Sequence, residues 1–299
     1  MDKYVNSEKK RWYEKFLTWF GDLKYFKAPC FVVYDPSSYR VKGEDVREVI
    51  DIIEPGDVVL RSYDNYVDGL FIPGEFSHVG FFYGHATEED RKSAGTMIDN
   101  NPEKLARVQR DDFKTGEQMV IHAMADGVFM EDVINFCRCD KMVILRLPET
   151  LKNSPQLEKV FIKTKFLPSE ENIYQKLKQG GDITRNEAVA AACEVVLTCL
   201  GARYDFRFDF KDEPHNSFSC SELAYYAYRS VARYINLRPI RTCVAGIICK
   251  EGITPDQFLE TGFELVWASR SVRSHPMIRE RLQARAGLSD SVSEGGEDQ

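Results

Sequence analysis

The sequence of 299 residues has few histidines and no long apolar run. Its first residues lack the apolar centre of a signal peptide, and no stretch approaches the length that spans a bilayer. With a net charge of -7 and a pI near 5.4, it also lacks the basic excess that is typical of a nucleic-acid surface. We therefore expect a cytoplasmic protein that does not bind nucleic acid.

Cysteine is also sparse. The chain has eight cysteines, which are too few for a disulfide scaffold in a chain of this length. In a reducing compartment we expect most of them to be free thiols. Cys137 and Cys139 form a Cys-x-Cys pair, but no second pair lies at the spacing of a structural zinc site. The sequence therefore predicts neither a structural zinc site nor a cofactor.

The composition is that of a globular protein, with 43% hydrophobic and 12% aromatic residues, enough for a sizeable core. We divide the chain into an N-terminal helical extension (1–53), a central domain (54–268) and a tail (269–299). The tail is expected to be disordered from about residue 285, where Ser, Gly, Asp and Glu dominate. Two polar stretches, near 85–117 and 150–183, are expected to be insertions in the central domain.

An amphipathic helix with an aromatic face is predicted for residues 7–24. Such a helix could make peripheral contact with a membrane, or it could pack on the domain that follows it. Glu14 and Asp22 dilute its positive charge, which favours packing.

Short apolar runs bounded by turn residues predict a set of strands. They are residues 58–61, 76–83, 119–124, 142–147 and 263–267, with the alternating run 203–210 as a sixth. Helices are predicted at 43–53 and from a capping box at Thr184 and Glu187 to Leu200. Because strands occur in runs with helices between them, rather than in strict alternation, we predict an α+β fold.

One predicted helix carries a cysteine in its first turn. Ser219 is the expected N-cap and Glu222 completes a capping box, which places Cys220 at the first helical position. The helix dipole and the unpaired N–H groups there favour an anion and would lower the pKa of the thiol. In the alternative interpretation Cys220 is buried and inert, since free cysteine is among the most buried residue types.

Two of the five histidines, His78 and His122, lie in predicted strands. A cysteine hydrolase needs a thiolate, an imidazole within reach and a third polar group that orients the imidazole. Cys220, His78 and His122 could supply all three. This requires neighbouring strands, histidines that face the same side, and a cysteine helix packed on that sheet. The same three residues are also an open ligand set for zinc.

Five short motifs follow one another in a distinctive order. They are residues 54–60 (EPGDVVL), 76–80 (FSHVG), 204–206 (YDF), 219–223 (SCSEL) and 253–256 (ITPD). With these motifs the chain resembles the circularly permuted NlpC-type hydrolases of papain-like fold. The YiiX-like branch is the most similar, and lecithin:retinol acyltransferases are more distant. The resemblance covers residues 54–268 apart from the insertions, and it implies an antiparallel sheet with the nucleophile helix packed against it.

The resemblance implies Cys220 as the nucleophile, His78 as the general base and later the acid, and His122 as the third polar residue. The YiiX-like pattern usually has glutamate at the third position, whereas the acyltransferases have histidine. A neutral imidazole would stabilise an imidazolium less than a carboxylate does. The backbone N–H of Cys220 is the expected oxyanion donor. Further candidates for oxyanion or substrate binding are Tyr63, Ser219 and Ser221.

Together these residues predict a thiol hydrolase or acyltransferase that forms an acyl-enzyme on Cys220. It would cleave an amide, ester or thioester bond in a peptide or an acyl lipid. Two other functions stay open. One is a zinc site built from Cys220, His78 and His122, and the other is a non-catalytic module that binds an acyl chain or a peptide.

Overall fold

The computed structural model describes residues 39–64, 72, 74–93, 115–152, 166–206, 210, 217–244 and 248–294. The predicted helix 7–24 and most of the stretch 85–117 lie outside the described residues. Within those ranges, no helix combines the length and the apolar character needed to cross a membrane.

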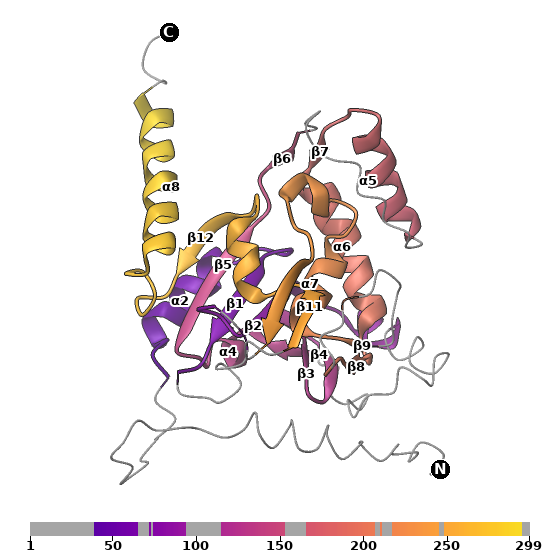
Figure 1. Cartoon of the computed structure of the whole chain (residues 1–299), viewed down its shortest axis with the longest axis horizontal. Helices are drawn as coiled ribbons and strands as arrows, with labels where there is room; N and C mark the ends of the chain where they lie inside the picture. The colour runs from indigo at the N-terminus through magenta and orange to yellow at the C-terminus, as the bar shows by residue number, and fades with distance from the viewer. Residues whose placement is uncertain are drawn as a thin grey trace.

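A six-stranded antiparallel sheet forms the centre of the molecule (Figure 1). Its spatial order is β12 (Glu264–Ala268), β5 (Lys141–Arg146), β1 (Val58–Ser62), β2 (His78–Ala86), β3 (Gly116–Met124) and β4 (Gly127–Asp132). The strands predicted at 58–61, 76–83, 119–124, 142–147 and 263–267 are confirmed, and β4 is an addition to them. An antiparallel sheet with helices on it agrees with the predicted α+β class.

Helices cover both faces of the sheet, which explains why β1 is buried at every position. One face, here called the α7 face, packs on α6 (Arg185–Cys199) and α7 (Cys220–Ala227). Its strand residues include Val58, Leu60, Val79, Phe81, Ile121, Val143 and Leu145. The opposite face, here called the α4 face, packs on α2 (Gly43–Ile52) and α4 (Val133–Phe136). Its strand residues include Val59, Phe82, Val120, Met142 and Ile144.

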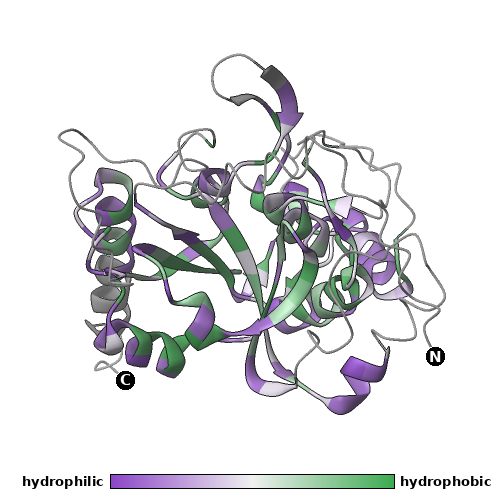
Figure 2. Ribbon diagram, turned by 90° about the horizontal axis from the view of Figure 1, so that it is seen from below, coloured by the Kyte–Doolittle hydropathy of each residue, from purple (hydrophilic) through white to green (hydrophobic). Residues whose placement is uncertain are grey.

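The remaining elements are short or lie at the margins of the sheet. They are α5 (Pro168–Lys178), α8 (Pro276–Glu294), η4 (Ala232–Ile235), η5 (Pro255–Glu260), β6 (Thr150–Leu151), β7 (Ile183–Thr184), β8 (Arg203–Tyr204), β9 (Ser217–Phe218), β10 (Ile240–Val244) and β11 (Ile248–Gly252). Figure 2 shows hydrophobic residues concentrated on the central strands and on the helices that pack against them. This distribution is expected for helices that each bury one stripe.

Local helix signals are confirmed by the structure. At the start of α6, the Glu187 N–H donates to the Thr184 hydroxyl at 3.3 Å, and the Thr184 N–H donates to Glu187 at 2.8 Å. The chain leaves the helix through Gly201, whose φ of 77° is favoured by glycine. The predicted helix 43–53 is also present, as α2.

Two predictions differ from the structure. In the alternating run 203–210, the described residues 205, 206 and 210 are not strand, and Arg203 and Tyr204 form the strand β8, which pairs with Ser217 and Phe218 of β9. The tail is helical to Glu294, where disorder from residue 285 was predicted. Arg285 donates to the Val266 carbonyl at 2.6 Å, so α8 is held against β12.

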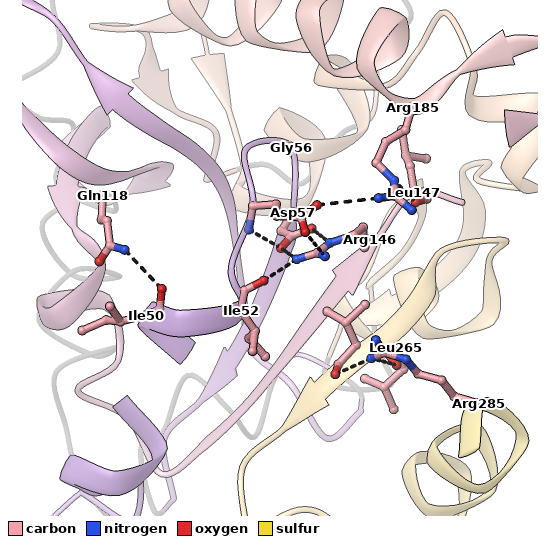
Figure 3. Close-up of polar contacts among 12 residues, drawn as sticks. Ile50, Ile52, Gly56, Asp57, Gln118, Arg146, Leu147, Arg185, Leu265 and Arg285 are labelled. Atoms are coloured by element: carbon pink, nitrogen blue, oxygen red, sulfur yellow. Dashed lines mark hydrogen bonds and ion pairs between the residues drawn. The ribbon is translucent and has the colours of Figure 1, made fainter. Parts of the chain in front are cut away.

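The Gly56-Asp57 motif joins the first strand to its surroundings (Figure 3). Arg146 of β5 donates from Nε and Nη2 to the two carboxylate oxygens of Asp57, both at 2.8 Å. The Gly56 N–H donates to the Phe82 carbonyl at 2.8 Å, and the Tyr228 hydroxyl, just after α7, donates to the Gly56 carbonyl. The motif therefore fixes β1, β2, β5 and the end of α7 relative to one another.

Candidate active site

The cysteine helix begins as the sequence predicts. The Glu222 N–H donates to the Ser219 hydroxyl at 3.3 Å, and the Ser219 N–H donates to the Glu222 carboxylate at 2.7 Å. This capping box makes Cys220 the first residue of α7. Because its hydroxyl accepts the hydrogen bond that caps α7, Ser219 has a structural role. Substrate binding is not needed to explain its position.

Cys220 lies where strands β2 and β3 separate. The Phe82 N–H points towards β1, where it donates to the Asp57 carbonyl, so alternation directs the Val79 N–H towards β3. The β2–β3 ladder, however, ends at the pair of Gly80 and His122. Beyond that pair, the Val79 N–H hydrogen-bonds the Cys220 sulfur instead. The thiol thus accepts the hydrogen bond that the next residue of β3 would otherwise accept from Val79.

Burial raises the pKa of the Cys220 thiol. The residue is only 5% exposed. Hydrogen bonds from the Val79 N–H, the Ser221 hydroxyl and the Ser221 N–H act in the opposite direction without outweighing the desolvation. The prediction that the helix start lowers the pKa is therefore wrong in sign, because the sulfur is removed from water as well as placed at the dipole.

The structure brings His78 and His122 together. Nε2 of His78 lies 2.9 Å from Nδ1 of His122, and the two rings meet at 84°. They come from adjacent strands, and both are buried. Two of the conditions set by the sequence are met, since the strands are neighbours and the histidines share a face.

A carboxylate and a guanidinium extend this pair. Oε1 of Glu131 lies 3.2 Å from Nε2 of His122 and 3.2 Å from Nη1 of Arg61. Arg61 in turn stacks on the Phe136 ring, 3.9 Å from its centroid, and donates to the Phe136 carbonyl at 3.0 Å. A buried chain therefore runs from Arg61 through Glu131 and His122 to His78.

Glu131 and Arg61 were missed by the sequence analysis. A usable signal was present for Glu131, because Asp126-Gly127 follows a predicted strand and is a common hairpin turn. The resulting hairpin pairs His122 with Phe129, and Glu131 is two residues further on the same face. No comparable signal exists for Arg61, whose side chain reaches Glu131 across two intervening strands of the sheet.

The charges of this chain follow from burial and from the ion pairs. Burial lowers the pKa of His78 well below its ordinary value, and the positive charge of Arg61 adds to this effect. Burial also lowers the pKa of His122, although Glu131 opposes the shift. For Glu131, burial acts to raise the pKa, but the contacts with His122 and Arg61 outweigh it, and the net shift is downward. Near neutral pH, both imidazoles are therefore neutral and the carboxylate is ionised.

The thiol and the imidazoles approach strand β2 from opposite faces. His78 and His122 lie on the α4 face, with ring centroids 5.8 and 5.3 Å from that of Phe136. Cys220 belongs to the hydrophobic cluster of the α7 face. Among the described residues, the polar contacts of its sulfur are with Val79 and Ser221, and a direct bond to an imidazole is not one of them. The third condition, a cysteine helix packed on the sheet, is also met, although α7 packs on the face opposite to the imidazoles.

The other two candidates, Tyr63 and Ser221, differ in their position relative to the sulfur. Tyr63 lies on the α4 face, where burial raises its pKa to about 12 and Arg61 lies 5.5 Å from its ring centroid. The Ser221 hydroxyl lies 3.9 Å from the Cys220 sulfur and is buried. Within the described part of the chain, no three His, Cys, Asp or Glu side chains are arranged to hold a metal ion. The zinc hypothesis thus gains no support from the geometry.

No family model, no curated protein and no solved structure matches the chain. The resemblance to permuted papain-like hydrolases therefore remains a prediction based on the motifs.

Proposed function

We propose that the protein is a thiol hydrolase or acyltransferase of permuted papain-like fold, with Cys220 as nucleophile and His78 as general base. One observation carries the proposal. A buried chain of polar side chains ends at His78, and the Cys220 sulfur hydrogen-bonds the N–H of the very next residue, Val79. Buried imidazoles and carboxylates are costly for a fold to retain, so their alignment beside a cysteine favours catalysis.

The resting state in this proposal is neutral. Because burial raises the pKa of Cys220 and lowers that of His78, the thiol and the imidazole are both neutral and form no ion pair. As the sulfur attacks a carbonyl carbon, the thiol proton passes to His78. His78 then returns the proton to the leaving amine, alcohol or thiol as the acyl-enzyme forms. Water or another acceptor releases the acyl group. A local rearrangement must first bring the sulfur and the imidazole together.

The substrate in this proposal is a peptide or an acyl lipid, since both carry a carbonyl that a thiol can attack. The start of α7 is the proposed site for the developing oxyanion, with the Cys220 N–H as donor.

A second function is favoured by one specific observation. Helix α7 and the imidazoles lie on opposite faces of the sheet, and among the described residues the polar contacts of the sulfur are with Val79 and Ser221 and not with an imidazole, whereas a thiol separated from its base cannot react efficiently. This separation favours a non-catalytic module that binds an acyl chain or a peptide.

Acylation with p-nitrophenyl acetate, a generic acyl donor, separates the two functions. We expect p-nitrophenol release and an acetyl group on Cys220, located by peptide mapping after acid quench. Cys220→Ala and His78→Ala should both lose the reaction. Cys193→Ala is the matched control and should retain it, because Cys193 is a half-buried thiol whose pKa burial raises to about 12.

The proposal is wrong if Cys220→Ala releases p-nitrophenol as fast as the unaltered protein, or if His78→Ala is acetylated on Cys220 at an unchanged rate. Either result would leave the binding module as the better account of this fold.

A further inference from the structure

We infer that Glu131 and Arg61 are positioning residues that set the tautomers of both imidazoles and leave Nδ1 of His78 as the basic atom. The catalytic meaning of this inference rests on the proposed function. The tautomers themselves can be measured whether or not the protein is an enzyme.

The carboxylate of Glu131 decides where the proton of His122 lies. An ionised carboxylate can only accept hydrogen bonds. Nε2 of His122 is fully buried and has no well-aligned hydrogen bond within the described chain. A Glu131 oxygen lies 3.2 Å from this nitrogen, and an ionised carboxylate at that distance can only accept. The favourable arrangement places the single proton of the neutral His122 ring on Nε2.

The single proton on each neutral ring then decides which nitrogens of His122 and His78 donate. A neutral imidazole carries one N–H, so Nδ1 of His122 has a lone pair and must accept. Its partner at 2.9 Å is Nε2 of His78, which must then donate. His78 is neutral too, and its remaining nitrogen, Nδ1, is left without a proton. Because Nε2 is engaged by His122, Nδ1 is also the ring atom that remains for a thiol.

Arg61 holds the carboxylate that begins this sequence. Arg61 is only 3% exposed, and its guanidinium is fixed by the Phe136 ring and carbonyl, so it presents Nη1 to Glu131 from one direction. A positive charge at this distance keeps Glu131 ionised. A protonated Glu131 could donate to His122 instead and would reverse both tautomers.

Nitrogen NMR of histidine provides the direct test. In protein labelled with 15N-histidine at pH 7.5, we expect both His78 and His122 to carry the proton on Nε2. Glu131→Leu removes the acceptor, and we expect His122 and His78 to populate the Nδ1–H form. Glu131→Asp should restore the original pattern at least in part. The matched control is Glu117→Gln, which alters an exposed carboxylate 3.0 Å from His85 and should leave both tautomers unchanged.

Acetylation of Cys220 by p-nitrophenyl acetate gives the second readout. We expect Glu131→Leu to slow it by about 10- to 100-fold, the range found when a group that orients a metal-binding histidine is removed. Should Glu131→Leu fail to fold, as judged by circular dichroism, Glu131→Met, which also removes the accepting oxygens, would provide the same measurements.

The two measurements separate the positioning role of Glu131 from the proposed function. Expected tautomers without any acylation of Cys220 would support the positioning role and refute the proposed function. Acylation in a protein whose histidines carry their protons on Nδ1, or whose tautomers are unchanged in Glu131→Leu, would refute the positioning role alone.

Discussion

Replacing Asp57 by asparagine should destabilise the fold by about 3 kcal/mol, near the lower end of the range for breaking a buried ion pair. Asp57 is completely buried, and its carboxylate accepts two hydrogen bonds from Arg146 and one from the Glu54 N–H, all at 2.8 Å. Bonds to charged groups contribute about 1.5 to 3 kcal/mol each. Asparagine keeps one accepting oxygen but places an amide N–H₂ against the guanidinium, so one bond is lost and Arg146 is left underpaired.

We expect a loss near the lower end of that range because a second carboxylate partly replaces Asp57 as the partner of Arg146. Nη1 of Arg146 also contacts Glu54 at 2.6 Å, and that carboxylate is half exposed, with 51% of its side-chain surface accessible. Glu54 therefore still provides Arg146 with a negative charge in the variant, although solvent weakens that interaction.

Urea unfolding followed by far-ultraviolet circular dichroism measures the effect. The free energies of unfolding of Asp57→Asn, Arg146→Met and the double variant form a cycle that isolates the coupling between the two side chains. We expect a coupling of about 1 to 3 kcal/mol, because the residues are in direct contact. A loss below about 1 kcal/mol for Asp57→Asn, or additive single losses, would refute this account of the Gly56-Asp57 motif.

Two further predictions concern the same strands. Gly56→Ala should lower the free energy of unfolding by about 2 to 4 kcal/mol, because φ is 90° and a Cβ would lie 2.4 Å from Val189. Gly43→Ala, where a Cβ meets no atom within 4 Å, is the control, and equal losses in urea unfolding would contradict the explanation. Lowering the pH from 7 to 5.5 should decrease the free energy of unfolding by about 1 kcal/mol through His78. In the unfolded chain this imidazole binds a proton near pH 6.5, whereas in the folded protein it stays neutral at that pH because burial lowers its pKa. This contribution is complete above that pH and is lost below it, so His78→Asn should flatten the dependence of the urea midpoint on pH.

Local signals in the sequence predicted local structure well. The capping boxes at Thr184 and Ser219 depend on residues three apart, and both form as expected. The short β-branched runs likewise became strands, because turn residues bound each of them. The run 203–210 shows the limit of such patterns, since alternation does not say how many residues find a partner strand, and among its described residues Arg203 and Tyr204 are the ones that pair.

The features of the candidate site that were missed depend on tertiary structure. Whether burial or the helix dipole decides the pKa of Cys220 depends on how deeply α7 packs, which a helix signal does not contain. The identity of the face is equally non-local. Alternation correctly placed His78 and Gly80 together, but only the packing of α4 and α7 shows that Cys220 lies on the other side.

The neutral resting state determines which measurement is informative about Cys220. A thiolate–imidazolium pair would have to form in a region that excludes water, where separated charges are expensive. An acyl substrate lowers that cost, because the negative charge moves from sulfur to a carbonyl oxygen that N–H groups at the start of α7 can stabilise. An alkylating agent such as iodoacetamide offers no comparable oxygen and reacts with the thiolate, which is scarce when burial raises the pKa. Slow alkylation is therefore expected of a hydrolase and of a binding module alike, and acylation of Cys220 is the reaction that separates them.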